Sequence, residues 1–130
     1  MSENYPILAG AEPFSAAGEN AAHPDRAQTA LALIHGFTGS PVSMRPLAEL
    51  LVAQGFRVEA PRLPGHGTHP TDMQRTRYAD WRSEVLSCID RLQRESKRLV
   101  LVGLSMGGTL VLDVASSGER RVDGVVAVNA

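Results

Sequence analysis

The sequence contains a single cysteine, Cys88, which excludes a disulfide within the chain and suits a reducing compartment. It has no apolar run long enough to cross a bilayer. Residues 1–18 are acidic and interrupted by Pro6 and Pro13, so they lack the basic start and long apolar core of a signal peptide. These absences predict a cytoplasmic protein with no membrane span.

The sequence also lacks an excess of charge of one sign. Its 13 Lys and Arg residues against 14 Asp and Glu residues give a net charge of −1, which offers no electrostatic attraction for nucleic acid or an anionic membrane. Neither a glycine-rich phosphate-binding loop nor a metal-ligand spacing of histidines and carboxylates is present. We therefore expect no cofactor, no metal ion and no nucleic-acid partner.

The patterns that are present predict an α/β fold. The 130 residues, 43% of them hydrophobic, suffice for one domain with a core. Apolar strands that alternate with helices indicate a mostly parallel sheet of about four core strands, with helices on both faces. Residues 1–28 are expected to form an irregular arm with room for a short strand, and 29–130 to form the α/β domain. The predicted strands are 29–34, 56–60, 98–102 and 122–129, the predicted helices are 43–54, 77–95 and 106–116, and 62–76 is a predicted loop.

The first of these helices has identifiable ends and one apolar face. Met44, Leu47 and Leu51 fall along one face of 43–54 at helical spacing. Ser43 is the predicted N-cap, and Gly55 stands where a helix commonly ends.

The segment Gly103-Leu104-Ser105-Met106-Gly107 matches the pattern G-x-S-x-G. An apolar strand precedes it, and Gly108 and an apolar helix follow, which is the setting of a nucleophile elbow. Such a turn exposes the serine hydroxyl, and its glycines, which have no Cβ, let the chain double back. The alternative is a chance match in a glycine-rich turn, since the pattern fixes three positions. The flanking strand and helix favour the elbow, with Ser105 as nucleophile.

A second motif, His35-Gly36-Phe37-Thr38-Gly39-Ser40, follows the first predicted strand, at the edge where ligands bind in α/β sheets. With it, four further blocks occur in order along the chain. They are 61–68 (Pro-Arg-Leu-Pro-Gly-His-Gly-Thr), 72–73 (Asp-Met), 80–81 (Asp-Trp) and 103–108 (Gly-Leu-Ser-Met-Gly-Gly). Together they resemble the α/β-hydrolase superfamily, and within it the bacterial carboxylesterase and monoacylglycerol lipase group.

The resemblance implies a serine hydrolase that cleaves short- or medium-chain carboxylic esters, or monoacylglycerols, through an acyl-enzyme and without a cofactor. It implies that the backbone N–H groups of Phe37 and Met106 form the oxyanion hole. The residues that it implies as supports of the loop and the elbow are His35, Gly36, Gly103, Gly107 and Gly108.

The resemblance also exposes a missing part. In the family the acid and the histidine of the triad follow the serine, but none of the four histidines of this chain lies after Ser105. We therefore expect the N-terminal half of a hydrolase, inactive or very weak alone. His66 is a substitute base by the general logic of the triad, although His35 and His66 fit structural roles better.

Two further questions stay open at this point. Thioester hydrolysis, peptide hydrolysis and acyl transfer share the same half-site, and a non-catalytic fragment or interaction module that kept the fold is the alternative to an enzyme. The apolar strand at 122–129 is expected to form a bare edge, which predicts self-association or pairing with a complementary C-terminal half. Trp81 and Cys88 are expected in the core, and Asp113 on a helix surface.

Overall fold

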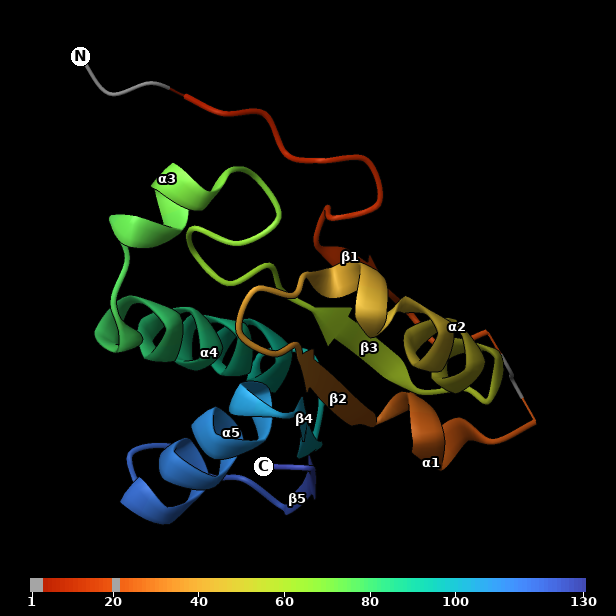
Figure 1. The fold of residues 1–130 in the computed structure, drawn as a ribbon. Coiled ribbons are helices and arrows are strands. Elements are labelled where there is room, and N and C mark those ends of the chain that lie inside the picture. Colours follow the sequence, from red (N-terminus) through yellow and green to blue (C-terminus); the bar gives the residue numbers. More distant parts are fainter. Residues whose placement is uncertain (1–3, 20–21) are drawn as a thin grey trace.

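A computed structural model of the protein describes residues 4–19 and 22–130 and contains one five-stranded sheet (Figure 1). The strand order is β1-β3-β2-β4-β5, and every pairing is parallel except that of β1 with β3. The predicted α/β fold with a mostly parallel sheet is therefore confirmed. The strands are β1 (Phe14–Ala16), β2 (Thr29–Ile34), β3 (Arg57–Ala60), β4 (Arg98–Leu104) and β5 (Gly124–Val128). The helices are α1 (Pro24–Ala27), η1 (Pro41–Ser43, a 3-10 turn), α2 (Arg45–Ala53), α3 (Pro70–Gln74), α4 (Tyr78–Gln93) and α5 (Met106–Ser117).

Helices cover both faces of the sheet, as predicted: α2 lies on one face, and α4 and α5 lie on the other (Figure 1). Alternate residues of β2 supply the two cores. Ala32 and Ile34 pack in the cluster that includes α4 and α5, whereas Leu33 packs in the cluster that includes α2. Both faces of the central strands are therefore buried, which explains why the sequences of these strands are continuous apolar runs.

The helix predicted at 43–54 differs in its start and in its buried face. The side chain of Ser40 accepts a hydrogen bond from Val42 N–H, so the chain turns into η1 before α2 begins, and Ser43 is not the N-cap. Ala48 and Val52 are buried, whereas Leu47 is exposed. Ala48 and Val52 are therefore the α2 side chains buried in the core on this face of the sheet.

Three short elements lie in the segments expected to be mainly irregular: β1 and α1 in the arm, where a short strand was allowed for, and α3 in the 62–76 loop. β1 forms in the arm because Phe14 and Ala16 pair antiparallel with Ala60 and Val58 of β3. In the predicted loop at 62–76, α3 begins at Pro70, and the His69 side chain caps it by accepting a hydrogen bond from Thr71 N–H. The boundary at residue 28 stays a prediction, and residues 1–3 and 20–21 of the arm lie outside the described residues.

Candidate functional site

The candidate site lies where β2 and β4 end side by side. These strands are parallel neighbours, and Ile34 is in register with Gly103. The residues that follow them therefore reach the same edge of the sheet. A Cβ placed on Gly36 would lie 3.3 Å from Ser105 Cβ and 3.8 Å from Ser105 Oγ. The backbone of the 35–40 turn thus lies directly against the serine.

Ser105 has a backbone conformation that is unusual for a serine. Its φ of 56° and ψ of −122° lie outside the regular regions, at the residue that joins β4 to α5. Neighbouring structure holds this conformation: Ser105 N–H donates to Val128 C=O at 2.8 Å, and Ser105 C=O accepts from Gly108 N–H at 2.8 Å. The side chain is exposed. This geometry is the sharp strand-to-helix turn that the G-x-S-x-G pattern predicts.

The glycines around Ser105 are required by close backbone approach. A Cβ on Gly107 would overlap the carbonyl oxygens of Ile34 and His35, and a Cβ on Gly103 would overlap the backbone of Gly107. The first turn of α5 therefore packs directly on the ends of β2 and β4. A Cβ on Gly108 would lie 2.8 Å from the side chain of Ala130.

The backbone N–H groups of Phe37 and Met106 have no acceptor among the described residues. Met106 is the first residue of α5, and the first amides of a helix have no intrahelical partner. Phe37 follows Gly36, and a hydrogen bond from Gly39 N–H to Gly36 C=O at 3.0 Å closes the turn. Within 4–19 and 22–130, neither Phe37 N–H nor Met106 N–H donates a hydrogen bond to another residue.

His35 is a structural brace with both ring nitrogens engaged. Its buried ring accepts a hydrogen bond from Leu63 N–H at Nε2 (3.1 Å), and Nδ1 lies 2.9 Å from Gly36 C=O. Because Leu63 N–H can only donate, Nε2 must be unprotonated, and the proton is on Nδ1. Burial lowers the pKa of His35 from 6.5 to about 4. The ring is therefore neutral at physiological pH and joins the turn to the 61–68 loop.

His66 is also fully buried, in an aromatic cluster. Its ring lies 5.1 Å from that of His35, 5.9 Å from Phe37 and 5.3 Å from Trp81. Nδ1 is 3.0 Å from Pro64 C=O, and burial lowers the pKa of the ring. Nε2 is enclosed and has no hydrogen-bond partner among the described residues. No hydrogen bond joins it to Ser105, so its role as a substitute base remains a prediction.

Trp81 contributes to this neighbourhood in a way that its helical spacing did not indicate. Its indole N–H donates to Pro64 C=O at 3.0 Å and to Thr76 Oγ1 at 3.1 Å, and its ring lies 5.7 Å from that of Phe37. It is partly buried and supports the 61–68 loop as well as packing against the core. The apolar spacing along α4 predicts that Trp81 packs against the core. Nothing in the sequence near position 81 predicts its hydrogen bond to Pro64.

Two other side chains lie where the sequence analysis expected them. Cys88 is fully buried, and burial raises the pKa of its thiol, which opposes a nucleophilic role. Asp113 lies on the surface of α5 and accepts hydrogen bonds from Tyr78 Oη at 2.8 Å and Arg82 Nε at 3.1 Å. These contacts join α4 to α5 and are made away from the tip of the elbow.

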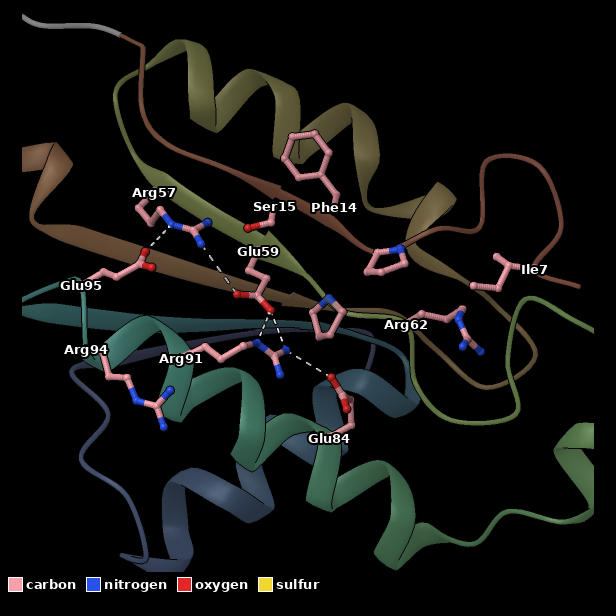
Figure 2. Close-up of a pocket in the computed structure, with 12 residues that line it drawn as sticks. Ile7, Phe14, Ser15, Arg57, Glu59, Arg62, Glu84, Arg91, Arg94 and Glu95 are labelled. Atoms are coloured by element: carbon pink, nitrogen blue, oxygen red, sulfur yellow. Dashed lines mark hydrogen bonds and ion pairs between the residues drawn. The ribbon is translucent and has the colours of Figure 1, made fainter.

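A pocket of about 650 Å³ lies elsewhere, between the β1–β3 edge and α4 (Figure 2). Ion pairs cross it: Arg57 contacts Glu95 at 2.9 Å, and Arg91 contacts Glu59 at 2.8 Å and Glu84 at 3.2 Å. Neither Ser105 nor any residue of the 35–40 turn lines it. Its three glutamates are all held in ion pairs with Arg57 or Arg91, so its size alone does not make it the reactive site.

The described residues lack two further features. They contain no helix that combines the length and the apolar character needed to cross a membrane. They also contain no cluster of three or more His, Cys, Asp or Glu side chains placed to hold a metal ion.

Comparison with known proteins gives consistent results. Residues 29–130 match the model of the family described as "alpha/beta hydrolase fold". The chain is 45% identical over 130 residues to a thermostable monoacylglycerol lipase of Bacillus sp. (strain H-257), covering all of this chain and 48% of that protein. It is 34% identical over 84 residues to a carboxylesterase of Bacillus subtilis (strain 168), covering 64% of this chain and 34% of that protein.

A similar solved structure is that reported for LipS and LipT, two metagenome-derived lipolytic enzymes. It superposes with a TM-score of 0.82 at 37% identity, covering 92% of this chain and 46% of that chain. The chain thus spans about half the length of the relatives that it matches. On its fold, its motifs and these matches, the chain belongs to the alpha/beta hydrolase fold family.

Proposed function

We propose that this chain carries the nucleophile and the oxyanion hole of a carboxylic-ester hydrolase, with Ser105 as the nucleophile. The observation that carries the proposal is the exposed Ser105 hydroxyl at the β4–α5 turn, with the backbone of Gly36 against it. A hydroxyl beside two free amides is what acyl transfer requires.

In the proposed reaction, Ser105 Oγ attacks the ester carbonyl carbon while a base accepts the hydroxyl proton. The negative charge that develops on the carbonyl oxygen is stabilised by the N–H groups of Phe37 and Met106, each worth about 3–4 kcal/mol. The C–O bond to the alcohol then breaks, and the base returns its proton to the leaving alkoxide. Water, deprotonated by the same base, finally attacks the acyl-enzyme, and the acid is released as the base returns the proton to Ser105 Oγ.

The base is the part of this mechanism that the chain does not supply. His35 has both nitrogens engaged, and His66 Nε2 is enclosed. We therefore assign the triad histidine and acid to the half of the relatives that this chain does not span. Loss of the base costs about 10⁶ in turnover in a well-studied serine protease, so we expect very little turnover from this chain alone.

The proposed substrates are short- or medium-chain carboxylic esters or monoacylglycerols. The support for this class is the 45% identity to a monoacylglycerol lipase and the 34% identity to a carboxylesterase. Thioesterase, peptidase and acyltransferase chemistry share the same half-site. The choice of an ester as the substrate is therefore a more specific proposal than the use of Ser105 as the nucleophile. A cytoplasmic location stays a prediction.

Labelling with a fluorophosphonate tests the proposal. The chain should form a covalent adduct, slowly alone and faster with the second half of a full-length relative added as a separate polypeptide. Ser105→Ala should abolish labelling, whereas Ser116→Ala, on the exposed end of the same helix, should label like the original chain. Absence of labelling under both conditions would overturn the proposal in favour of a non-catalytic fragment.

A further inference from the structure

A second pocket, of about 470 Å³, lies between the turn after β2 and the segment from Gly65 to Met73. The N-terminal arm forms its third side through Leu8, Ala9 and Ala11. We infer that this pocket binds an uncharged aliphatic chain of the ester substrate, and that the arm is one of its walls. Naming the ligand as an ester rests on the proposed function, whereas binding of the chain itself does not.

The arm is held against the pocket at several points. Leu8 N–H donates to Gly67 C=O at 2.8 Å, and Ala11 N–H donates to Leu8 C=O at 2.9 Å. The buried Ala11 side chain lies so close to Gly67 that a Cβ there would be 2.8 Å away. The Tyr5 ring stacks on that of His69, with centroids 4.2 Å apart and an 8° angle between the planes. These contacts hold residues 5–11 in place as a wall.

The chemistry of the lining favours an uncharged ligand. Among the residues that line this pocket in the described part of the chain, none is Asp, Glu, Lys or Arg. The charged pocket of Figure 2 provides the contrast, since ion pairs cross it. Transfer of an ionised group into a site without an opposite charge is costly, so a carboxylate or an ammonium would be rejected.

Three polar side chains of the lining are engaged with the protein itself. Ser40 Oγ accepts from Val42 N–H at 3.3 Å, and Ser43 Oγ donates to Ser40 C=O at 3.0 Å. On the other side, Thr68 Oγ1 donates to the Asp72 carboxylate at 2.6 Å. The surfaces left for a ligand are therefore mainly apolar.

Exposed apolar side chains face both sides of this space. Leu8 on the arm is 57% exposed, and Val42 after the turn is 53% exposed. Burying such side chains against a ligand removes apolar surface from water, which favours binding. A volume of about 470 Å³ falls within the usual range of small-molecule sites.

The position of the pocket connects it to the candidate active site. Thr38 and Gly39 line it, and they belong to the turn whose Gly36 lies against Ser105. The pocket therefore begins two residues along the turn from Gly36, which places it beside the candidate active site.

Ligand titration followed by NMR tests the inference directly. The chain carries Ser105→Ala to prevent hydrolysis, and the probes are methyl hexanoate, whose chain is the acyl part, and hexyl acetate, whose chain is the alcohol part. We expect shifts at the methyl groups of Leu8, Val42 and Met73. The probe that binds more tightly identifies which part of the ester enters the pocket. The hexanoate anion should bind at least tenfold more weakly than methyl hexanoate.

Substitutions on two walls separate this pocket from nonspecific binding. Ala9→Phe should fill the pocket and weaken binding at least tenfold, whereas Ala17→Phe, an equally exposed site on the arm that does not line the pocket, should change it less than twofold. Val42→Asp should weaken binding as strongly from the opposite wall. Thermal melts confirm that each variant is folded.

Two results would overturn the inference: no shifts at the pocket methyl groups, or equal affinity in the Ala9→Phe and Ala17→Phe variants. If Ser105 is labelled but the chain does not bind the probes, the pocket inference is wrong and the proposed function is unaffected. If the probes bind but Ser105 is not labelled, the proposed function is wrong and the binding of an aliphatic chain in the pocket is unaffected.

Discussion

Ser105 keeps a strained backbone conformation because contacts with neighbouring residues hold it in place. A non-glycine residue with such a φ costs on the order of 1–3 kcal/mol, and here hydrogen bonds to Val128 and Gly108 hold the turn. In this conformation Ser105 is exposed, and Met106 N–H donates no hydrogen bond to another described residue. Strain of this kind is expected where a side chain must be presented rather than packed.

The lowered pKa of the single residue His35 predicts that the stability of the fold depends on pH. Its pKa falls from 6.5 to about 4 on folding because the ring is buried, so below pH 6.5 the unfolded chain binds the proton more readily. Stability is full above pH 6.5 and declines as the pH falls toward 4, by about 3 kcal/mol from this residue. The lowered pKa of His66 acts in the same direction.

Chemical denaturation at a series of pH values measures this decline. In a His35→Asn variant the free energy of unfolding should depend less steeply on pH between 6.5 and 4. His23→Asn is the control, because His23 is exposed, and its slope should match that of the original chain. If the free energy of unfolding of His35→Asn depended on pH as steeply as that of the original chain, His35 would not be buried in its neutral form.

At the scale of elements, the β4–α5 connection depends on backbone contact rather than side-chain packing. Gly107→Ala should cost about 3 kcal/mol or more, because the new Cβ overlaps the carbonyl oxygens of Ile34 and His35. Gly124→Ala is the matched control, since its Cβ would meet only Val100 methyl groups at 3.5 Å and 3.8 Å. That variant should change stability by less than about 1 kcal/mol. Equal melting temperatures of the two variants would contradict the tight packing.

The long elements follow from the sequence because their signals are local. The predicted strand 29–34 coincides with β2, and the helix predicted at 106–116 ends one residue before the observed end of α5, which the left-handed Gly118 terminates. The short elements do not follow in this way. β1 exists because β3 offers it an antiparallel partner, and α3 consists of five residues started by Pro70 and a His69 cap.

The site divides in the same way. Because neighbouring parallel strands end at one edge, the sequence places Ser105 and the 35–40 turn together. The enclosure of His66 by Phe37 and Trp81, and the contact of the arm with Gly67, depend on the packing of loops that are distant in sequence. Periodicity carries no signal for such contacts.

At the scale of the whole molecule, the sheet ends on one side in β5, and this edge favours association. Within the described residues β5 pairs only with β4, and Val126 and Val128 on it are 48% and 42% exposed. Unpaired apolar edges associate with other strands. We predict that sedimentation will show a concentration-dependent mass for this chain.

A charge on this edge should reduce that association. Val126→Lys should shift the chain toward monomer at equal concentration, whereas Leu50→Lys, on exposed α2, should not. A monomer at every concentration in the unsubstituted chain would contradict an open edge that associates.

The arrangement of the Ser105 hydroxyl beside two amides is tested most directly by a crystal structure of the fluorophosphonate adduct. The account predicts a bond from Ser105 Oγ to phosphorus, with the phosphoryl oxygen within about 2.7–3.1 Å of both Phe37 N and Met106 N. An adduct on another residue, or one whose phosphoryl oxygen contacts neither amide, would contradict it.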